Sequence, residues 1–408
     1  MEISENTDLR LKELAQSIGS SDPLNNFSIF YGDGGIYLAL DALSKKFPAN
    51  QSIAIYRQKF LENTLENLTS SDYPNLTFSI GCVGFMAGLI VSESEDYDYE
   101  ELFKPIDRAM IGLVQEFRSK DHPYDPFKGI LGSMNYLRFR KTVIGDEWEK
   151  CLNEVVAYFD QTKYPFFDGI IWLEDKRKDI QHEKEKAMLC NLGLAHGEMA
   201  ILFWLGLAYK ETKNPIALSL IKDAFKAIQA IAKDFNHPIV HYPSVINKDN
   251  TYNGSDIAWC YGDLSSAIVL NLLGEVTELE AIKIEAHQVA LNAANNVLNL
   301  PIPDDSCLCH GLAGNAYMLN LLQERYPAEG AFGAARDRLL NDLLKADNQN
   351  ESNTFKGYQN REFSYEKNEM ERAPIKNMLN GDAGIALAIL GMEDRNYRYW
   401  DRLMLMRY

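Results

Sequence analysis

The sequence predicts an all-α protein, an α/α toroid built as a double ring of seven helical hairpins with inner and outer helices. A glycine motif followed by an apolar, helix-like run recurs seven times in the 408 residues. Amphipathic segments lie between these runs. The last copy is as apolar as the middle ones, whereas an open linear array needs a polar cap at each end. We therefore expect the repeat to close on itself.

Each copy of the motif reads glycine, two residues, then a second glycine or another small residue. The copies are "YGDGGIYLAL", "IGCVGFMAGL", "KGILGSMNYL", "HGEMAILFWL", "YGDLSSAIVL", "HGLAGNAYML" and "NGDAGIALAI". Their first glycines are Gly32, Gly81, Gly129, Gly197, Gly262, Gly311 and Gly381. Successive first glycines are separated by 48 or 49 residues in the short steps and by 65 to 70 in the long ones. A short step fits two helices and their turns.

The three long steps are therefore expected to carry inserted loops within a single domain that spans residues 1–408. These loops fall near 160–185, 236–256 and 346–374, and the segment "FDGIIWLE" (167–174) is the best candidate for a strand. Between the motifs, segments such as 279–300 are amphipathic and predict outer helices. In that segment the apolar positions near helical spacing are Ile282, Ala286, Val289 and Val297.

Composition and charge narrow the function classes. A net charge of -17 argues against binding to nucleic acid or anionic lipid, because phosphate neutralisation needs a basic face. The start "MEISENTDLR" lacks the apolar core of a secretory signal, and no apolar run is long enough to span a membrane. Six cysteines are too few for a disulfide scaffold in so long a chain. We expect a cytoplasmic protein with reduced thiols that are open to metal or catalytic use.

Two cysteines occupy the same register in consecutive repeats. Cys260 and Cys309 each lie two places before a first glycine, and His310 follows Cys309 directly. Equivalent positions in neighbouring units of a ring lie side by side, so these three side chains should meet. Two thiolates and one imidazole suit Zn²⁺ and leave a fourth coordination position open, as in catalytic zinc sites. The competing interpretations are two buried structural thiols, and Cys307 as a rival ligand, although its register fits no other repeat.

The same face should carry acid–base groups. His196 holds in the fourth repeat the position of His310 but has no cysteine before it, so it is a candidate general acid or base. A packed or capping histidine is the alternative. Asp125 could orient His196 or serve only as a turn residue before proline, and His122 is equally ambiguous. Tyr261 could donate a hydrogen bond into the site or merely pack.

Three segments carry a resemblance to a known family. "WCYG" (259–262), "CHGLAG" (309–314) and "GLAHG" (193–197) resemble signature motifs of the lanthionine synthetase C-like family, which includes the lantibiotic cyclases. The resemblance runs through all seven repeats and implies an α/α toroid with one catalytic zinc ion. By match to the family's motifs, Cys260, Cys309 and His310 resemble the zinc ligands. His196, Asp125 and Tyr261 resemble the catalytic histidine, the active-site aspartate and the tyrosine beside the first ligand.

The resemblance also implies a reaction. Such cyclases add cysteine thiols of a ribosomally made precursor peptide to dehydroalanine or dehydrobutyrine, and so close thioether rings in lantibiotic biosynthesis. The implied partners are a dehydrated precursor peptide, a separate dehydratase and an exporter. Association with the membrane periphery through such a complex is compatible with a cytoplasmic location.

Three other functions stay open. One is a family member that binds glutathione or adds a small thiol to dehydrated residues. Another is a zinc prenyltransferase, but its usual ligand set includes a carboxylate. The third is a non-catalytic peptide-binding toroid. At three places the sequence departs from the family's pattern. Asp256 stands where an arginine is common, Leu264 and Ser265 replace a proline and a glycine, and the third small residue of the histidine motif is Ala200.

Overall fold

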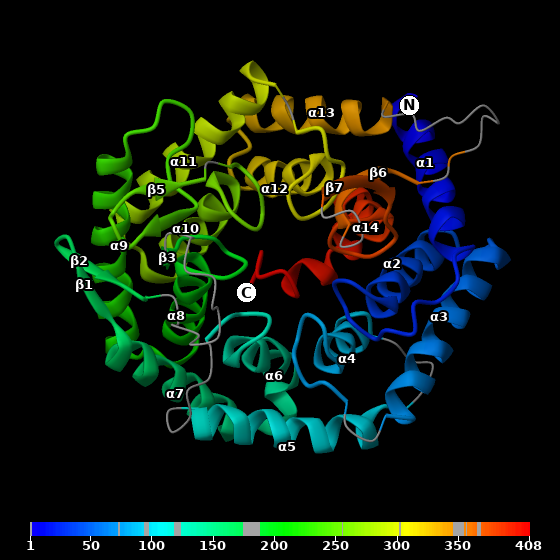
Figure 1. Cartoon of the computed structure of the whole chain (residues 1–408), viewed down its shortest axis with the longest axis horizontal. Coiled ribbons are helices and arrows are strands. Elements are labelled where there is room, and N and C mark those ends of the chain that lie inside the picture. Colours follow the sequence, from blue (N-terminus) through cyan, green and yellow to red (C-terminus); the bar gives the residue numbers. More distant parts are fainter. Residues whose placement is uncertain are drawn as a thin grey trace. The chain divides into compact units, whose positions relative to one another are not determined.

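The structure is a computed structural model that describes residues 2–71, 74–93, 98–117, 124–173, 188–254, 256–301, 303–345, 355, 357–364 and 369–408. These residues contain fourteen α-helices and seven short strands (Figure 1). The chain divides into two compact units. Unit 1 comprises Met1–Glu100 and Val297–Met404, and unit 2 comprises Glu101–Asn296 and Leu405–Tyr408. No helix in the described part of the chain is both long and apolar enough to cross a membrane.

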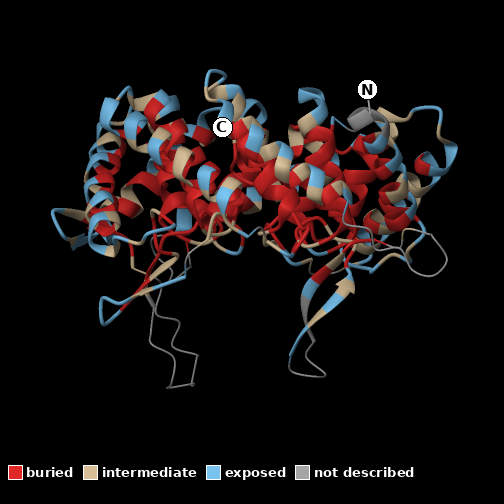
Figure 2. Ribbon diagram, turned by 90° about the horizontal axis from the view of Figure 1, so that it is seen from above, coloured by how far each residue is buried: buried red, intermediate tan, exposed pale blue. Residues whose placement is uncertain are grey.

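Every predicted motif run is a helix that begins directly after its first glycine. These seven motif helices are α2 (Asp33–Lys46), α4 (Cys82–Val91), α6 (Ile130–Ile144), α8 (Glu198–Thr212), α10 (Asp263–Thr277), α12 (Leu312–Arg325) and α14 (Asp382–Glu393). The first glycine is the N-cap residue in each of them. Most of their residues are buried, as Figure 2 shows for the helical interior.

The seven flanking helices alternate with the motif helices along the chain. They are α1 (Glu2–Gly19), α3 (Gln51–Thr69), α5 (Glu100–Glu116), α7 (Asp146–Thr162), α9 (Pro215–Phe235), α11 (Glu280–Asn299) and α13 (Gly330–Lys345). The predicted apolar positions of α11, Ile282 to Val297, are buried, while Ile284 on its other face is 59% exposed. Two short 3₁₀ helices, Arg395–Tyr397 and Tyr399–Arg402, follow α14.

The motif glycines are needed because the chain before each motif helix packs against the start of that helix. At Gly311 a Cβ atom would overlap the backbone nitrogen of Cys307, and at Gly314 it would overlap the carbonyl oxygen of Leu308. The backbone N–H of Leu312 donates a hydrogen bond of 2.9 Å to the carbonyl of Asp305, seven residues earlier. Bonds of the same span recur at the starts of α2, α4, α10 and α14. A tight turn therefore precedes each of these helices.

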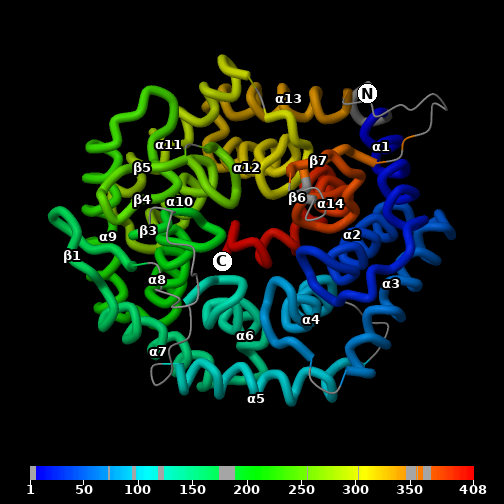
Figure 3. Tube along the Cα trace, viewed as in Figure 1, coloured from blue at the N-terminus to red at the C-terminus, as the bar shows by residue number. Residues whose placement is uncertain are grey.

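Within unit 1 the first and last repeats are neighbours, as the prediction of closure requires. Helix α14 packs against α2 and α12, and α2 packs against α4 (Figure 3). The backbone N–H of Leu379 donates to the carbonyl of Phe30 at 3.0 Å. Helix α1 also packs against α14. The last motif helix thus receives its flanking partner from the start of the chain, which the sequence analysis did not foresee.

All seven strands lie in the three long steps. The first step holds β1 (Tyr164–Phe166), β2 (Gly169–Ile171) and β3 (Met188–Asn191), and the second holds β4 (Val245–Asn247) and β5 (Tyr252–Asn253). Strands β3, β4 and β5 form an antiparallel sheet in that order, and β1 pairs with β2. In the third step β6 (Gln359–Ser364) pairs with β7 (Glu369–Pro374). The strand candidate 167–174 contains β2, and its last residue lies outside the described residues.

An acidic residue follows the first glycine in four repeats, and all four are buried: Asp33, Glu198, Asp263 and Asp382. Glu198 accepts a hydrogen bond of 2.7 Å from the backbone N–H of Trp172, which lies in the inserted segment before it. Asp263 accepts in the same way from the backbone of His241 and Tyr242. Glu198 and Asp263 thus each tie an inserted segment to the positive end of a helix. Burial raises the pKa of Glu198 to about 8 and that of Asp263 to about 6.

Candidate functional site

Backbone hydrogen bonds join several of the turns that precede neighbouring motif helices. In unit 1 three of the four residues that lie two places before a first glycine donate to their counterpart in the next repeat. Cys309 donates to Leu379 at 3.0 Å, Leu379 to Phe30 at 3.0 Å, and Phe30 to Ser79 at 3.5 Å. Equivalent sequence positions are therefore neighbours in space within this unit, which is the premise of the ligand prediction.

The turn of Cys260 is held in the same way in unit 2. The backbone N–H of Ala195, which holds this position in the fourth repeat, donates to the carbonyl of Cys260 at 3.3 Å. A Cβ atom at Gly193 would overlap that carbonyl and lie 2.6 Å from the ring of Tyr261. Gly193 therefore permits the close approach of the turns that carry His196 and Cys260. Cys260 itself is half-buried.

The residue directly before each first glycine points away from the core. All seven are exposed or half-exposed: Tyr31, Ile80, Lys128, His196, Tyr261, His310 and Asn380. The side chains of His196 and His310 are 35% and 37% exposed. Both candidate histidines are therefore accessible to a substrate or an ion.

His310 has a buried carboxylate as its neighbour. Its Nε2 lies 3.3 Å from Oδ2 of Asp305, whose side chain is only 5% exposed. Burial alone would raise the pKa of Asp305, but the hydrogen bonds from His310 and from the backbone N–H of Arg361 hold it below its usual value. An ionised carboxylate only accepts hydrogen bonds, so in the neutral imidazole Nε2 carries the proton and Nδ1 is the nitrogen with the lone pair. Asp305 was not predicted from the sequence. In the sequence it is only an acidic residue four places before Cys309, and this spacing does not reveal which side chain its carboxylate contacts.

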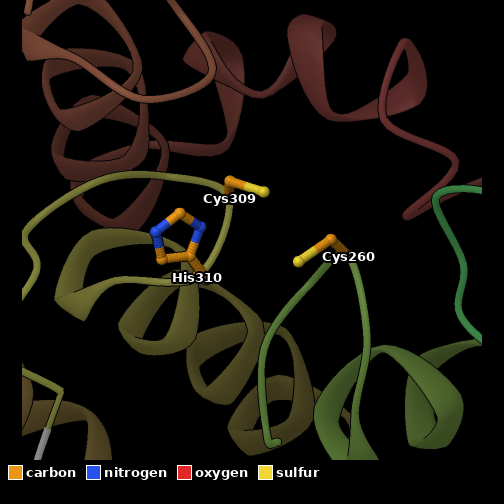
Figure 4. Close-up of side chains that lie close together, drawn as sticks. All are labelled: Cys260, Cys309 and His310. Atoms are coloured by element: carbon orange, nitrogen blue, oxygen red, sulfur yellow. The ribbon is translucent and has the colours of Figure 1, made fainter. Parts of the chain in front are cut away.

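In the described part of the chain, Cys260, Cys309 and His310 are a group of side chains that could hold a metal ion (Figure 4). Two sulfur donors and one nitrogen donor are the donor types that Zn²⁺ prefers. None of the six cysteines forms a disulfide. Cys309 is 8% exposed, whereas Cys307, the rival ligand, is fully buried and outside this group.

The structure brings His196 and Asp125 together. Nδ1 of His196 lies 2.6 Å from Oδ2 of Asp125. Oδ1 of Asp125 accepts the backbone N–H groups of Phe127 at 2.8 Å and Lys128 at 2.7 Å. Burial would raise the pKa of Asp125, but the hydrogen bond and charge of His196, together with these two N–H groups, lower it below its usual value. The carboxylate is therefore ionised at neutral pH, Nδ1 of His196 donates to it, and Nε2 is the nitrogen that can exchange a proton.

Tyr261 lies beside this pair. Its hydroxyl accepts a hydrogen bond of 3.2 Å from Nδ2 of Asn191, and its ring centroid is 6.5 Å from that of His196. Asn191, a further residue that the sequence analysis missed, also accepts the backbone N–H of Gly193 at 2.9 Å. The candidate His122 lies outside the described residues.

Comparisons with known proteins identify the fold and the family of the chain. Among solved structures, nisin cyclase is similar with a TM-score of 0.71 and 19% sequence identity, over 99% of this chain and 98% of that chain. A sugar epimerase from a ruminal bacterium has a TM-score of 0.41 and 10% identity, over 96% of this chain and 99% of that one. No sequence among curated proteins matches the chain.

The likeness to nisin cyclase shows that the chain has the fold of that protein, and it confirms the predicted fold class. The sequence model described as "Lanthionine synthetase C-like protein" matches residues 23–405, which is most of the chain. The chain therefore belongs to the lanthionine synthetase C-like family.

Proposed function

We propose that the protein is a zinc-dependent lanthionine synthetase that closes thioether rings in a dehydrated precursor peptide. Family membership, the fold of nisin cyclase and the Cys–Cys–His donor set support this proposal. The observation that carries the proposal is the contact of His196 with the ionised Asp125. His196 lies in the turn that is hydrogen-bonded to the turn of Cys260. A protein that only binds peptides has no need of an imidazole oriented in this way.

Cys260, Cys309 and His310 would hold the zinc ion and leave one coordination position for a substrate thiol. A zinc ion bound there would supply the positive charge that lowers the pKa of that thiol below its usual value of roughly 8.5. The donors fit this task. Neither cysteine is in a disulfide, and if Nε2 of the neutral His310 ring donates to Asp305, Nδ1 is the ring nitrogen that would bind the ion.

His196 would move the proton of the addition. The substrate sulfur forms a C–S bond to the β-carbon of the dehydrated residue, and the electron pair of the double bond moves toward the α-carbon and its carbonyl. Nε2 of protonated His196, or a water that it holds, then gives a proton to the α-carbon. Asp125 would keep the imidazole in place through Nδ1 and stabilise its charged form. The next substrate thiol returns the proton, so His196 is restored.

The proposed partners follow from this chemistry. The substrate is a peptide that contains both cysteine and dehydrated residues, so a separate dehydratase must act first. We propose that an exporter removes the cyclised product and that the protein works in the cytoplasm. The alternative in the same family is a protein that binds glutathione or adds a small thiol to dehydrated peptides.

Incubation of the purified protein with a dehydrated, cysteine-containing peptide tests the proposal. Ring closure leaves the peptide mass unchanged, while the number of thiols that can be alkylated falls, as mass spectrometry will show. A parallel reaction uses glutathione and a dehydrated peptide without cysteine, where the added mass of glutathione marks the thiol-adding alternative. Unchanged thiols in the first reaction, with the zinc ion in place, would contradict the cyclase proposal.

A further inference from the structure

We infer that Asp305 is a positioning residue for His310, because its carboxylate selects the imidazole tautomer that can bind a metal through Nδ1. The inference rests on the proposed function, since it assumes that His310 is a metal ligand. Oδ2 of Asp305 lies 3.3 Å from Nε2 of His310, and the aspartate side chain is 5% exposed. Metal-binding histidines commonly donate their other ring N–H to a carboxylate, which fixes the ring and raises its basicity.

Asp305 is fixed beside the imidazole ring, because both its side chain and its backbone accept hydrogen bonds. Its Oδ1 accepts the backbone N–H of Arg361 in β6 at 3.0 Å. Its backbone carbonyl accepts the N–H of Leu312 at the start of α12 at 2.9 Å. One carboxylate oxygen is thus used for the fold, and the other is left for the imidazole.

The chain also offers a matched control on the same loop. Asp304 binds Arg361 at 2.6 Å and Arg372 at 2.7 Å, both in the β6–β7 hairpin, and its side chain is 59% exposed. These contacts with Arg361 and Arg372 join the loop to the hairpin rather than to the ring of His310. A substitution of Asp304 therefore perturbs the anchoring of the loop and leaves the carboxylate on His310 in place.

Asp305→Asn separates the two roles of Asp305. The amide oxygen can still accept the N–H of Arg361, so the structural contact is kept. The amide nitrogen, however, is a donor and would face Nε2 of His310. The imidazole would then place its proton on Nδ1, where it blocks the metal.

The first experiment measures zinc affinity by competition with a chelator, in the wild type, Asp305→Asn, Asp304→Asn and His310→Ala. Asp305→Asn should weaken zinc binding by about 10–100-fold, while Asp304→Asn stays within about twofold of the wild type. In the His310→Ala background, Asp305→Asn should cause no further loss. Two results would overturn the inference. One is a zinc affinity of Asp305→Asn within about twofold of the wild type, and the other is a loss of zinc affinity in the His310→Ala background as large as that in the wild-type background.

A second measurement does not depend on zinc. Nitrogen NMR of the histidine rings in the metal-free protein, assigned with His310→Ala, should show the proton of His310 on Nε2 in the wild type and on Nδ1 in Asp305→Asn. A wild-type His310 with its proton on Nδ1 would overturn the inference even if zinc binds. A wild type that binds no zinc would instead contradict the proposed function, so the two failures are distinct.

Discussion

His196 and Asp125, which are 71 residues apart in the sequence, share a hydrogen bond of 2.6 Å. The same carboxylate caps the turn before α6 through two backbone N–H groups. Asp125 therefore has a structural task on one oxygen and an orienting task on the other. His196 lies in the turn before α8, so this contact links the third and fourth repeats at the face where the motif helices begin.

His196→Asn should slow ring closure by about 10²–10⁴-fold, which is the usual contribution of a general acid or base. Zinc content should stay at the wild-type level, because His196 is proposed to move a proton and not to bind the ion. Trapping of free thiols on a dehydrated peptide measures the rate, and elemental analysis measures the zinc. Ring closure at the wild-type rate would remove His196 from the mechanism.

Asp125→Asn should also slow ring closure. The amide oxygen can still accept the N–H groups of Phe127 and Lys128, so the turn is kept. The charge that stabilises protonated His196 is lost, and the amide nitrogen cannot accept its Nδ1–H. The ring-closure rate of this variant is compared with that of the wild type, and equal melting temperatures show that the fold is kept. A rate equal to that of the wild type would leave Asp125 as a turn residue only.

Glu198 predicts a pH dependence of stability. Its pKa rises from 4.5 to about 8 in the folded protein because it is buried. The folded state therefore holds this proton more tightly than the unfolded state. The protonated carboxyl group therefore makes its full contribution to the free energy of unfolding below about pH 4.5. This contribution is lost as the pH rises through about 8, by at most about 1.4 kcal/mol per pH unit.

Glu198→Gln keeps an oxygen that can accept the N–H of Trp172 and cannot ionise. Urea unfolding from pH 6 to pH 9 should show the wild type losing stability relative to this variant as the pH rises. Parallel stability curves for the two proteins would show that Glu198 stays ionised or has no effect in the folded state.

Gly193→Ala should impair zinc retention, because the added Cβ would overlap the carbonyl of Cys260 and crowd the ring of Tyr261. The matched control is Gly112→Ala in α5, where a Cβ would have no atom within 4 Å. Alanine there should raise stability by about 0.5–1 kcal/mol, since glycine is a poor helix former. Zinc analysis and thermal unfolding of both variants check this, and equal zinc content in the two variants would argue against a role of Gly193 in placing Cys260.

The sequence predicted those parts of the structure that the repeated glycine motif determines. The glycine register predicted where all seven motif helices begin, because a side chain at Gly311 or Gly314 would overlap the preceding turn. The contacts of Asp305 and Asn191 were not predictable in this way. Their partners depend on how inserted loops pack, and these loops differ from one repeat to the next. The pairing of α1 with α14 was missed for a similar reason, since no motif marks the first helix.

The zinc content of the purified protein and its cysteine variants tests the central claim most directly. We predict one zinc ion per chain in the wild type and in Cys307→Ala, because Cys307 is fully buried and outside the candidate group. Cys260→Ala and Cys309→Ala should each lose the ion, as elemental analysis of the folded variants will show. Full zinc retention in Cys260→Ala would contradict a centre held by Cys260, Cys309 and His310.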